Sequence, residues 1–226
     1  MPVGVSSSNL GSAGTTLDTS PAVNTQATGS TGVVGVVGDT GFFTSITDTI
    51  NGAASGNTWT QIETELADGT SANASRMYYC QNMNGGNNHV FRLNKASGSF
   101  ACIVFVELTT MLTSGALDQS GRQLDTASPF DSTSETTLQP NEVLVACSFA
   151  DDAGSNTYVA GNSFTIQSQQ TNGATSWTGA IATRVVTGTG SYNSTFTRTG
   201  AARVHSWIAT FIEDTGVNNM LAWIRA

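Results

Sequence analysis

The sequence predicts an all-β protein, an antiparallel β-sandwich of about nine to ten strands with a jelly-roll-like arrangement. Threonine, serine, asparagine and glycine make up 100 of the 226 residues, or 44%. Short apolar or alternating runs recur along the chain, and turn-forming Gly, Ser, Asn and Asp residues separate them. No segment of ten or more residues combines helical periodicity with helix caps.

The first half of the chain contains four predicted strands. Residues 32–38 are apolar on both faces and predict a buried strand, whereas 57–66 alternates and predicts a half-exposed strand. Residues 76–83 and 89–93 are the next two strands. The Gly and Asn residues of 84–88 tolerate positive φ, so this linker predicts a hairpin between them.

The second half follows the same pattern. Residues 100–108 and 143–150 are apolar throughout and predict central strands. The remaining predicted strands are 163–167, 180–186, 204–212 and 220–224. The segment 188–200 fits either a short hairpin or a loop.

The domain organisation follows from the absence of a linker. No Pro-rich or charge-rich segment divides the chain, and it contains no exact internal repeat. We expect an N-terminal arm and first strand over 1–28 and a single sandwich domain over 29–226. The segment 109–140 lacks a strand pattern and predicts a long loop within that domain.

The charge balance excludes several classes of protein. Charged residues are 11% of the chain, against roughly 25% in an average soluble protein. Sixteen acids and eight bases give a net charge of −8, and Lys95 is the only lysine. Nucleic-acid binding needs clustered cations, so it is not expected. The hydrophobic fraction of 38% argues against disorder.

The sequence shows no targeting or membrane signal. The N-terminus has no basic region followed by an apolar one, so we expect no signal peptide. No apolar stretch approaches the ~20 residues of a membrane span. We expect a protein that is made in a cytoplasm and has no membrane span.

The three cysteines are an odd number, so they do not make a complete disulfide framework. Cys102 and Cys147 lie in apolar runs and Cys80 follows two tyrosines. We interpret all three as small buried hydrophobes, with a Cys80–Cys102 bridge left open. Neither His89 nor His205 has zinc-finger spacing from a cysteine.

Several acidic residues are candidate catalytic or metal-binding groups. Glu63 and Glu65 lie two apart on one predicted strand and fit the spacing of a glycosidase pair, but a solvated strand face is the favoured interpretation. Glu107 ends an apolar strand and is expected to accept hydrogen bonds from backbone N–H groups or arginines. Asp151 and Asp152 offer oxygen ligands for calcium without the spacing of an EF-hand, so no metal and no cofactor are expected.

Aromatic residues provide the candidate binding site. Trp177, Tyr158 and Tyr192 lie beside polar turns, where exposed rings stack on sugars or anchor protein interfaces. Partial burial is the alternative for all three. Trp59 and Trp207 lie in predicted strands and are expected in the core. No nucleophile elbow accompanies the two histidines, so we expect a protein that is not an enzyme.

Sheet edges are normally protected by lysine, proline or inward-facing charge. This chain has one lysine and four prolines. Its edges must therefore be covered by loops or by partner chains. We expect a homo-oligomer, with a trimer favoured.

A resemblance covers the chain from about Gly29 to Glu213. The strand, Gly-Gly turn and strand of 77–91 are followed by a central strand ending in Val106-Glu-Leu108. Gly56-Asn-Thr-Trp59, Asn141-Glu-Val-Leu-Val145 and Trp207-Ile-Ala-Thr-Phe-Ile-Glu213 complete the order. The chain resembles β-sandwich modules of tailed-bacteriophage virions and of bacterial surface proteins.

The resemblance implies a function without catalytic residues. The first expectation is a virion structural protein, a capsid decoration subunit that binds the major capsid protein or other virion proteins. The second is a tail- or head-fibre module that recognises a host glycan. A jelly-roll glycosidase or lyase is the third.

Overall fold

A computed structural model describes residues 3–11, 14–39, 42–69, 73–98, 100–151, 157–171, 177–200 and 203–216 of the protein. Within these ranges the elements are nineteen β-strands, and none is a helix. The all-β sandwich-like fold predicted from the sequence is confirmed. The strand count is higher than predicted because several strands are only two or three residues long, too short to leave a periodic pattern.

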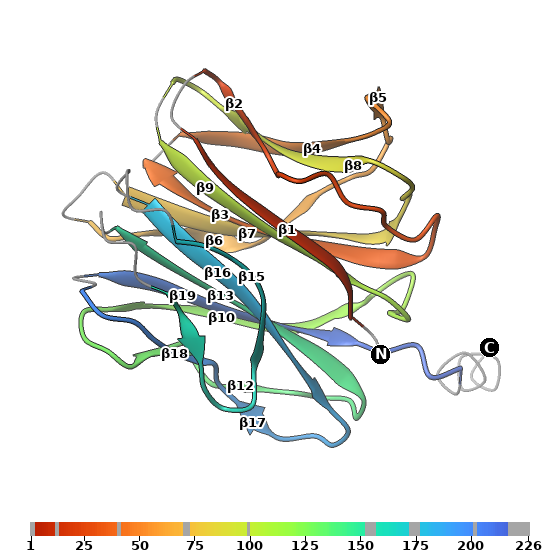
Figure 1. Ribbon diagram of the computed structural model, residues 1–226. Coiled ribbons are helices and arrows are strands. Elements are labelled where there is room, and N and C mark those ends of the chain that lie inside the picture. Colours follow the sequence, from red (N-terminus) through yellow and green to blue (C-terminus); the bar gives the residue numbers. More distant parts are fainter. Residues whose placement is uncertain are drawn as a thin grey trace.

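Two five-stranded antiparallel sheets form the middle of the molecule (Figure 1). The N-terminal central sheet has the strand order β1 (Val3–Gly11), β9 (Ala101–Leu108), β3 (Ser30–Asp39), β7 (Asn73–Met83), β6 (Thr60–Ala67). The C-terminal central sheet has the order β10 (Leu117–Asp125), β19 (Val204–Ile212), β13 (Glu142–Asp151), β16 (Trp177–Val186), β15 (Thr165–Gln170).

Smaller sheets cover the outer faces of these two sheets (Figure 1). The N-terminal outer sheet contains β2 (Thr16–Asp18), β8 (His89–Lys95), β4 (Phe43–Ile50) and β5 (Ala53–Ala54). The C-terminal outer sheet contains β11 (Phe130–Asp131), β18 (Thr195–Thr197) and β14 (Val159–Ala160). A further pair consists of β12 (Glu135–Thr136) and β17 (Ser191–Tyr192).

Each interface between layers contains an apolar core. β3 shows why its sequence is apolar on both faces: Val33 and Val37 face the C-terminal central sheet, and Val34 and Val36 face the N-terminal outer sheet. Gly35 lies where the two central sheets approach closely, since a Cβ there would come within 2.7 Å of the Cys147 sulfur. A third core lies beneath the C-terminal outer sheet.

The two halves of the chain have the same topology. All strands of the N-terminal sheets come from residues 3–108, and all strands of the C-terminal sheets come from residues 117–212. If β5, β12 and β17 are set aside, each half has eight strands. The first, eighth, third, sixth and fifth form the central sheet, and the second, seventh and fourth form the outer sheet. This is a jelly-roll order with the fifth strand moved beside the sixth.

A local contact repeats along with the topology. In the N-terminal half, Thr25 N donates to Gly86 O at 3.0 Å and Gly86 N donates to Thr25 Oγ1 at 3.0 Å. In the C-terminal half, Ser132 N donates to Ser194 O at 3.0 Å and Ser194 N donates to Ser132 Oγ at 2.9 Å. The molecule is therefore an internally repeated structure, although its sequence contains no exact repeat.

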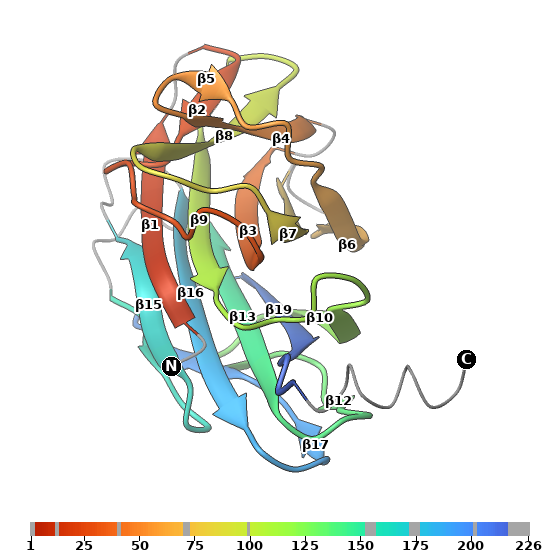
Figure 2. The same cartoon turned by 90° about the vertical axis from the view of Figure 1, so that its right-hand side faces the viewer.

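The outer strands of the two central sheets lie against each other in pairs, β1 with β15 and β6 with β10 (Figure 2). Ser6 Oγ donates to Gln167 O at 2.7 Å across the first pair. Arg122 Nη1 donates to Glu65 O across the second. The central edges thus cover one another within one chain, an arrangement that differs from the loops or partner chains expected from the composition.

Several sequence-based expectations need correction. The segment 84–88 is not a hairpin turn, because β7 and β8 belong to different sheets and the linker crosses between layers. The expected long loop 109–140 contains β10, β11 and β12. The segment 1–28, expected as an arm and a first strand, contains two strands, β1 and β2, which pair with β9 and β8. The expected strand 220–224 lies outside the described residues.

Candidate functional site

A pocket of about 400 Å³ opens at one edge of the N-terminal central sheet. The start of β6 and the end of β7 form its walls, and the loops at 56–58 and 113 complete it. We call it the first pocket. Its polar lining side chains include Thr58, Thr60, Tyr79, Gln81 and Asn82.

The first pocket is polar but uncharged. The described residues that line it carry amides, hydroxyls, one phenol and one thiol, and none is Asp, Glu, Lys, Arg or His. Its thiol is Cys80, and burial raises the pKa of Cys80 to about 11, so the sulfur is neutral at physiological pH. Asn82 adopts a left-handed backbone conformation (φ 50°), which an asparagine tolerates. The pocket therefore offers neutral hydrogen-bonding groups.

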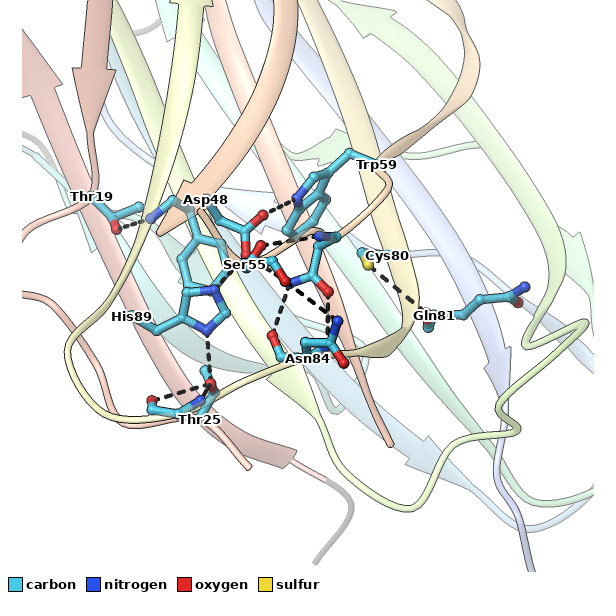
Figure 3. Close-up of polar contacts among 12 residues, drawn as sticks. Thr19, Thr25, Asp48, Ser55, Trp59, Cys80, Gln81, Asn84 and His89 are labelled. Carbon is cyan, nitrogen blue, oxygen red and sulfur yellow. Dashed lines mark hydrogen bonds and ion pairs between the residues drawn. The ribbon is translucent and has the colours of Figure 1, made fainter. Parts of the chain in front are cut away.

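A buried hydrogen-bond relay lies behind this pocket (Figure 3). His89 Nε2 lies 2.6 Å from Asp48 Oδ2, and His89 Nδ1 lies 2.8 Å from Thr25 Oγ1. The side chains of His89 and Asp48 are 0% and 1% exposed. Trp59 Nε1 donates to the other oxygen of Asp48 at 2.9 Å. The relay joins β8, β4 and two loops that are distant in the sequence.

Asn57 connects the relay to the wall of the first pocket. Its amide nitrogen donates to Asp48 Oδ2 at 2.7 Å and to Asn84 O at 2.8 Å. Its amide oxygen accepts from Asn84 N at 2.8 Å. Asn57 and Asn84 both line the pocket, so Asp48 fixes the position of two of its lining residues.

The electrostatics of Asp48 reflect this role. Burial alone would raise the pKa of Asp48, but hydrogen bonds from His89, Trp59, Ser55 and Asn57 outweigh it and hold the pKa below the ordinary value. Asp48 is therefore a carboxylate at neutral pH. A buried carboxylate with this many donors is a rigid anchor for the surrounding loops.

The relay has the residue types of a catalytic triad but not its accessibility. A nucleophile must reach a substrate, whereas the Thr25 residue is 8% exposed and its hydroxyl accepts a hydrogen bond from Gly86 N. His89 and Asp48 are closed off from solvent. We therefore assign the relay a structural role, which is to hold the surrounding loops in position.

The aromatic candidates from the sequence lie elsewhere. Trp177 is 3% exposed and belongs to the core between the central sheets. Tyr158 is 2% exposed, its hydroxyl lies 2.9 Å from Thr178 Oγ1, and burial raises its pKa to about 12. The expectation that these two rings are exposed is wrong, because Trp177 packs into the core between the central sheets and Tyr158 packs into the core beneath the C-terminal outer sheet.

Tyr192 is half-buried and has a defined partner. Its ring lies 4.8 Å from the Arg184 guanidinium carbon, and its hydroxyl donates to Gly188 O at 2.9 Å. Of the three candidate rings, only Tyr192 remains partly accessible. The structure does not bring the three together.

Glu63 and Glu65 do not form an isolated acid pair. A register irregularity between Ile62 and Leu66 interrupts the regular alternation that placed them on one face. Glu65 pairs with Arg76 at 2.9 Å, and Glu63 accepts a hydrogen bond from Ser120 Oγ at 2.7 Å.

Other acidic candidates have structural roles or lie outside the described part. Glu107 is 2% exposed and accepts a hydrogen bond from Gln26 N at 2.7 Å, which confirms its expected backbone contact. Asp151 ends β13, but its side chain is outside the described residues, as is all of Asp152. Among the described residues, no group of three or more His, Cys, Asp or Glu side chains is placed to hold a metal.

All three cysteines are free and buried, so the Cys80–Cys102 bridge is not formed and their interpretation as small buried hydrophobes is confirmed. Cys102 and Cys147 contribute to the core between the central sheets.

Comparisons with known proteins found no match. No protein-family description, curated protein or solved structure matches this chain, so its function is inferred from the geometry of the structure. Within the described ranges, no helix has the length and apolar character that a membrane span requires.

The relay and the first pocket were not predicted from the sequence. Thr25, Asp48 and His89 are separated by more than twenty residues each, and no spacing rule links them. The available signal was the density of asparagines and glycines over 81–88, which was interpreted as a turn.

Proposed function

We propose that this protein is a non-enzymatic binding module that recognises a neutral glycan in the first pocket. The observation that carries the proposal is the uncharged, amide- and hydroxyl-rich lining of that pocket. Sugars present many hydroxyl donors and acceptors without charge, and amides can both donate to and accept from them. A volume of about 400 Å³ is within the range of small-ligand sites.

Preorganisation supports a binding role. The relay holds Asn57 and Asn84 in place before any ligand arrives. Tyr79 is held by its ring contact with Phe211, with a centroid separation of 5.9 Å. A site that is already ordered loses less entropy when it binds a ligand.

The test is binding of neutral oligosaccharides on a glycan array, followed by calorimetric titration. Asn82→Gly removes an amide and keeps the left-handed backbone, and Thr60→Val removes a hydroxyl at constant shape. Each is expected to weaken binding about fivefold, since one hydrogen bond contributes roughly 1 kcal/mol. Asn94→Ala on β8, where the amide contacts Ser45, is the matched control. Unchanged affinity in both pocket variants would contradict the proposal.

The enzymatic alternative has a separate test. A glycosidase would hydrolyse the bound glycan, and Glu63→Gln or Glu65→Gln would abolish turnover. We expect no reducing ends to form in the wild-type protein, consistent with the ion pair of Glu65 and the closed relay.

The setting we propose is the outer surface of a phage particle, in a capsid decoration subunit or a fibre. Leu138 and Val159, at 62% and 61%, are the most exposed large apolar side chains of the described residues. Both belong to the C-terminal half, and the first pocket opens on the N-terminal central sheet, so attachment and glycan recognition would use different halves. Counting copies per particle distinguishes the settings: hundreds fit decoration, and a few confined to the tail fit a fibre.

A further inference from the structure

A second pocket of about 380 Å³ lies where the start of β1 meets β15 and β16, between the two central sheets (Figure 2). Its lining includes Val3, Val185, Thr165, Thr183 and Gln167. Val185 is 47% exposed and is one of four exposed large apolar side chains among the described residues. Part of the apolar lining of this pocket is therefore open to solvent.

The apolar surface of the second pocket is a margin of the core between the central sheets. Val185 pairs with Val143 in the ladder of β16 with β13, so the two side chains share one face of the sheet. Val143 belongs to the core between the central sheets, and Val3 packs against that same core. Covering this margin would remove further apolar surface from water, which stabilises the folded state.

The polar groups of the second pocket are paired with one another. Gln167 Nε2 donates to Thr183 Oγ1 at 2.8 Å and to Thr165 O at 3.3 Å, so both hydrogens of the amide are used. Gln167 O accepts a hydrogen bond from Ser6 Oγ at 2.7 Å. The pocket thus offers mainly apolar surface, which favours an apolar occupant.

The chain itself covers a neighbouring part of the same core. Ile212 and Val186 lie at one end of the C-terminal central sheet, because both pair with Glu142. Beside Ile212, the segment 109–116 closes the core: Met111 is 2% exposed, and Leu112 N donates to Ile212 O at 3.1 Å. No segment of the described residues does the same at the end of β16, so the margin stays open there.

The chain leaves β19 close to this open margin. The ends of β19 and β16 are two strand spacings apart, which is ~10 Å. After β19, Asp214 N donates to Thr110 O at 2.6 Å, and the described part of the chain continues to Gly216. The residues 217–226 that follow can span ~33 Å when extended, so they can reach the second pocket.

The segment 217–226 has the composition of an apolar anchor. Residues 220–224 are Met-Leu-Ala-Trp-Ile, a continuous apolar run in a chain that is 38% hydrophobic. Trp223 is the largest side chain of this run, and burial of a tryptophan removes roughly 150–250 Å² from water. The pocket volume of about 380 Å³ is within the range of sites that enclose small aromatic molecules.

We propose that residues 220–224 dock within their own chain in the second pocket, with Trp223 against Val3 and Val185. The docked segment completes the core between the central sheets at the end of β16, as 109–116 completes it beside β19. This contact is independent of the first pocket and of the glycan proposed to bind there.

The experiment labels the full-length protein with fluorotryptophan and measures the broadening of its fluorine NMR resonances by a soluble gadolinium chelate. Trp223→Phe identifies the resonance of Trp223. In the wild type, this resonance is expected to resist the chelate as well as those of the buried Trp177 and Trp207. Val185→Asp places a charge in the apolar pocket, so Trp223 is expected to lose its protection while Trp177 and Trp207 keep theirs, which shows that the fold is intact.

Two control variants place the same charge on exposed apolar positions outside the second pocket. Val159→Asp and Leu138→Asp, at positions 61% and 62% exposed, are expected to leave Trp223 protected. If Val185→Asp does not fold, Val185→Thr keeps the shape of the side chain and is expected to weaken the protection.

Four outcomes would overturn the inference. They are full broadening of the Trp223 resonance in the wild type, unchanged protection in the folded Val185 variant, loss of protection in Leu138→Asp or Val159→Asp, and protection that falls on dilution. The last would show that the segment binds a second copy of the chain.

Discussion

Asp48 accepts hydrogen bonds from His89 on β8 and from Ser55, Asn57 and Trp59 in the loop that precedes β6. A buried carboxylate is costly unless it is fully paired, so these residues depend on one another. The same contacts that stabilise the fold position Asn57 at the first pocket. At this scale, the side chains that stabilise the fold also position the lining of the pocket.

Asp48→Asn is expected to destabilise the protein by about 3 kcal/mol, because it leaves buried donors without their anionic acceptor. The pKa of Asp48 is lower in the folded state, so its stabilisation is complete above the unfolded-state pKa near 4 and is lost as the pH falls further. Urea unfolding at pH 3 to 7 measures the difference between wild type and variant. Asp18→Asn breaks the exposed pair with Arg92 and should cost about 0.5 kcal/mol. Equal losses in the two variants would contradict the assigned role of Asp48.

Sequence-based predictions for single residues were right in some cases and wrong in others. The backbone contact of Glu107 could be predicted because an acid inside an apolar strand must find donors. The burial of Trp177 and Tyr158 could not, because neighbouring turns do not reveal which face of a strand a ring occupies. The relay depends on the pairing of β4 with β8 and on two loops that are distant in the sequence, which local sequence does not encode.

At the scale of elements, the start of β13 contains an unusual group. Glu142 is 0% exposed, and its Oε2 has no hydrogen-bond partner of ordinary geometry among the described residues. Burial raises the pKa of Glu142 to about 7, Asp118 on β10 acts in the same direction, and hydrogen bonds from Thr210 and Gln139 N–H oppose them. Because its pKa is raised, Glu142 is partly protonated at neutral pH, which lowers the cost of burying its unpaired carboxyl oxygen.

Glu142→Gln is expected to remove one component of the pH dependence of stability. The folded-state pKa is raised, so the contribution of Glu142 is complete below pH 4.5 and is lost as the pH rises through about 7. The ratio of the wild-type and variant folding equilibrium constants should therefore fall by up to about tenfold per pH unit in this window. Urea unfolding from pH 4 to 8 measures this ratio.

The wild type must be compared with Glu142→Gln because His205 also contributes to the pH dependence of stability. Burial lowers the pKa of His205 to about 4, so its contribution rises with pH over an overlapping range and partly hides that of Glu142 in the wild type. The ratio to Glu142→Gln removes this effect. A ratio that stays constant between pH 4.5 and 7 would show that Glu142 does not hold a proton.

Long apolar strands could be predicted, and short ones could not. β3, β9 and β13 were recognised because central strands buried on both faces leave continuous apolar runs. β11, β12 and β14 have two residues each and no periodicity. The hairpin expected at 84–88 was wrong because sequence neighbours in a jelly roll alternate between sheets.

At the scale of the molecule, the two halves share one core. Val104, Val145 and Trp207 belong to the cluster between the central sheets, so neither half buries this face alone. The repeat was hidden from the sequence because β3 and β13 share only their apolar character.

A fragment of residues 1–112 is therefore expected to self-associate, since it exposes the inner face of its central sheet. Size-exclusion chromatography and binding of a hydrophobic dye measure this, with the full chain as the control. A monomeric fragment that binds no dye would contradict the shared core.

The pairing of β1 with β15 and of β6 with β10 has a consequence for how the protein meets its surroundings. Because these two seams cover the edges of both central sheets, the described edge strands of those sheets are not open to pairing with another chain. Aggregation by edge-to-edge strand pairing is therefore expected to require the opening of one seam first.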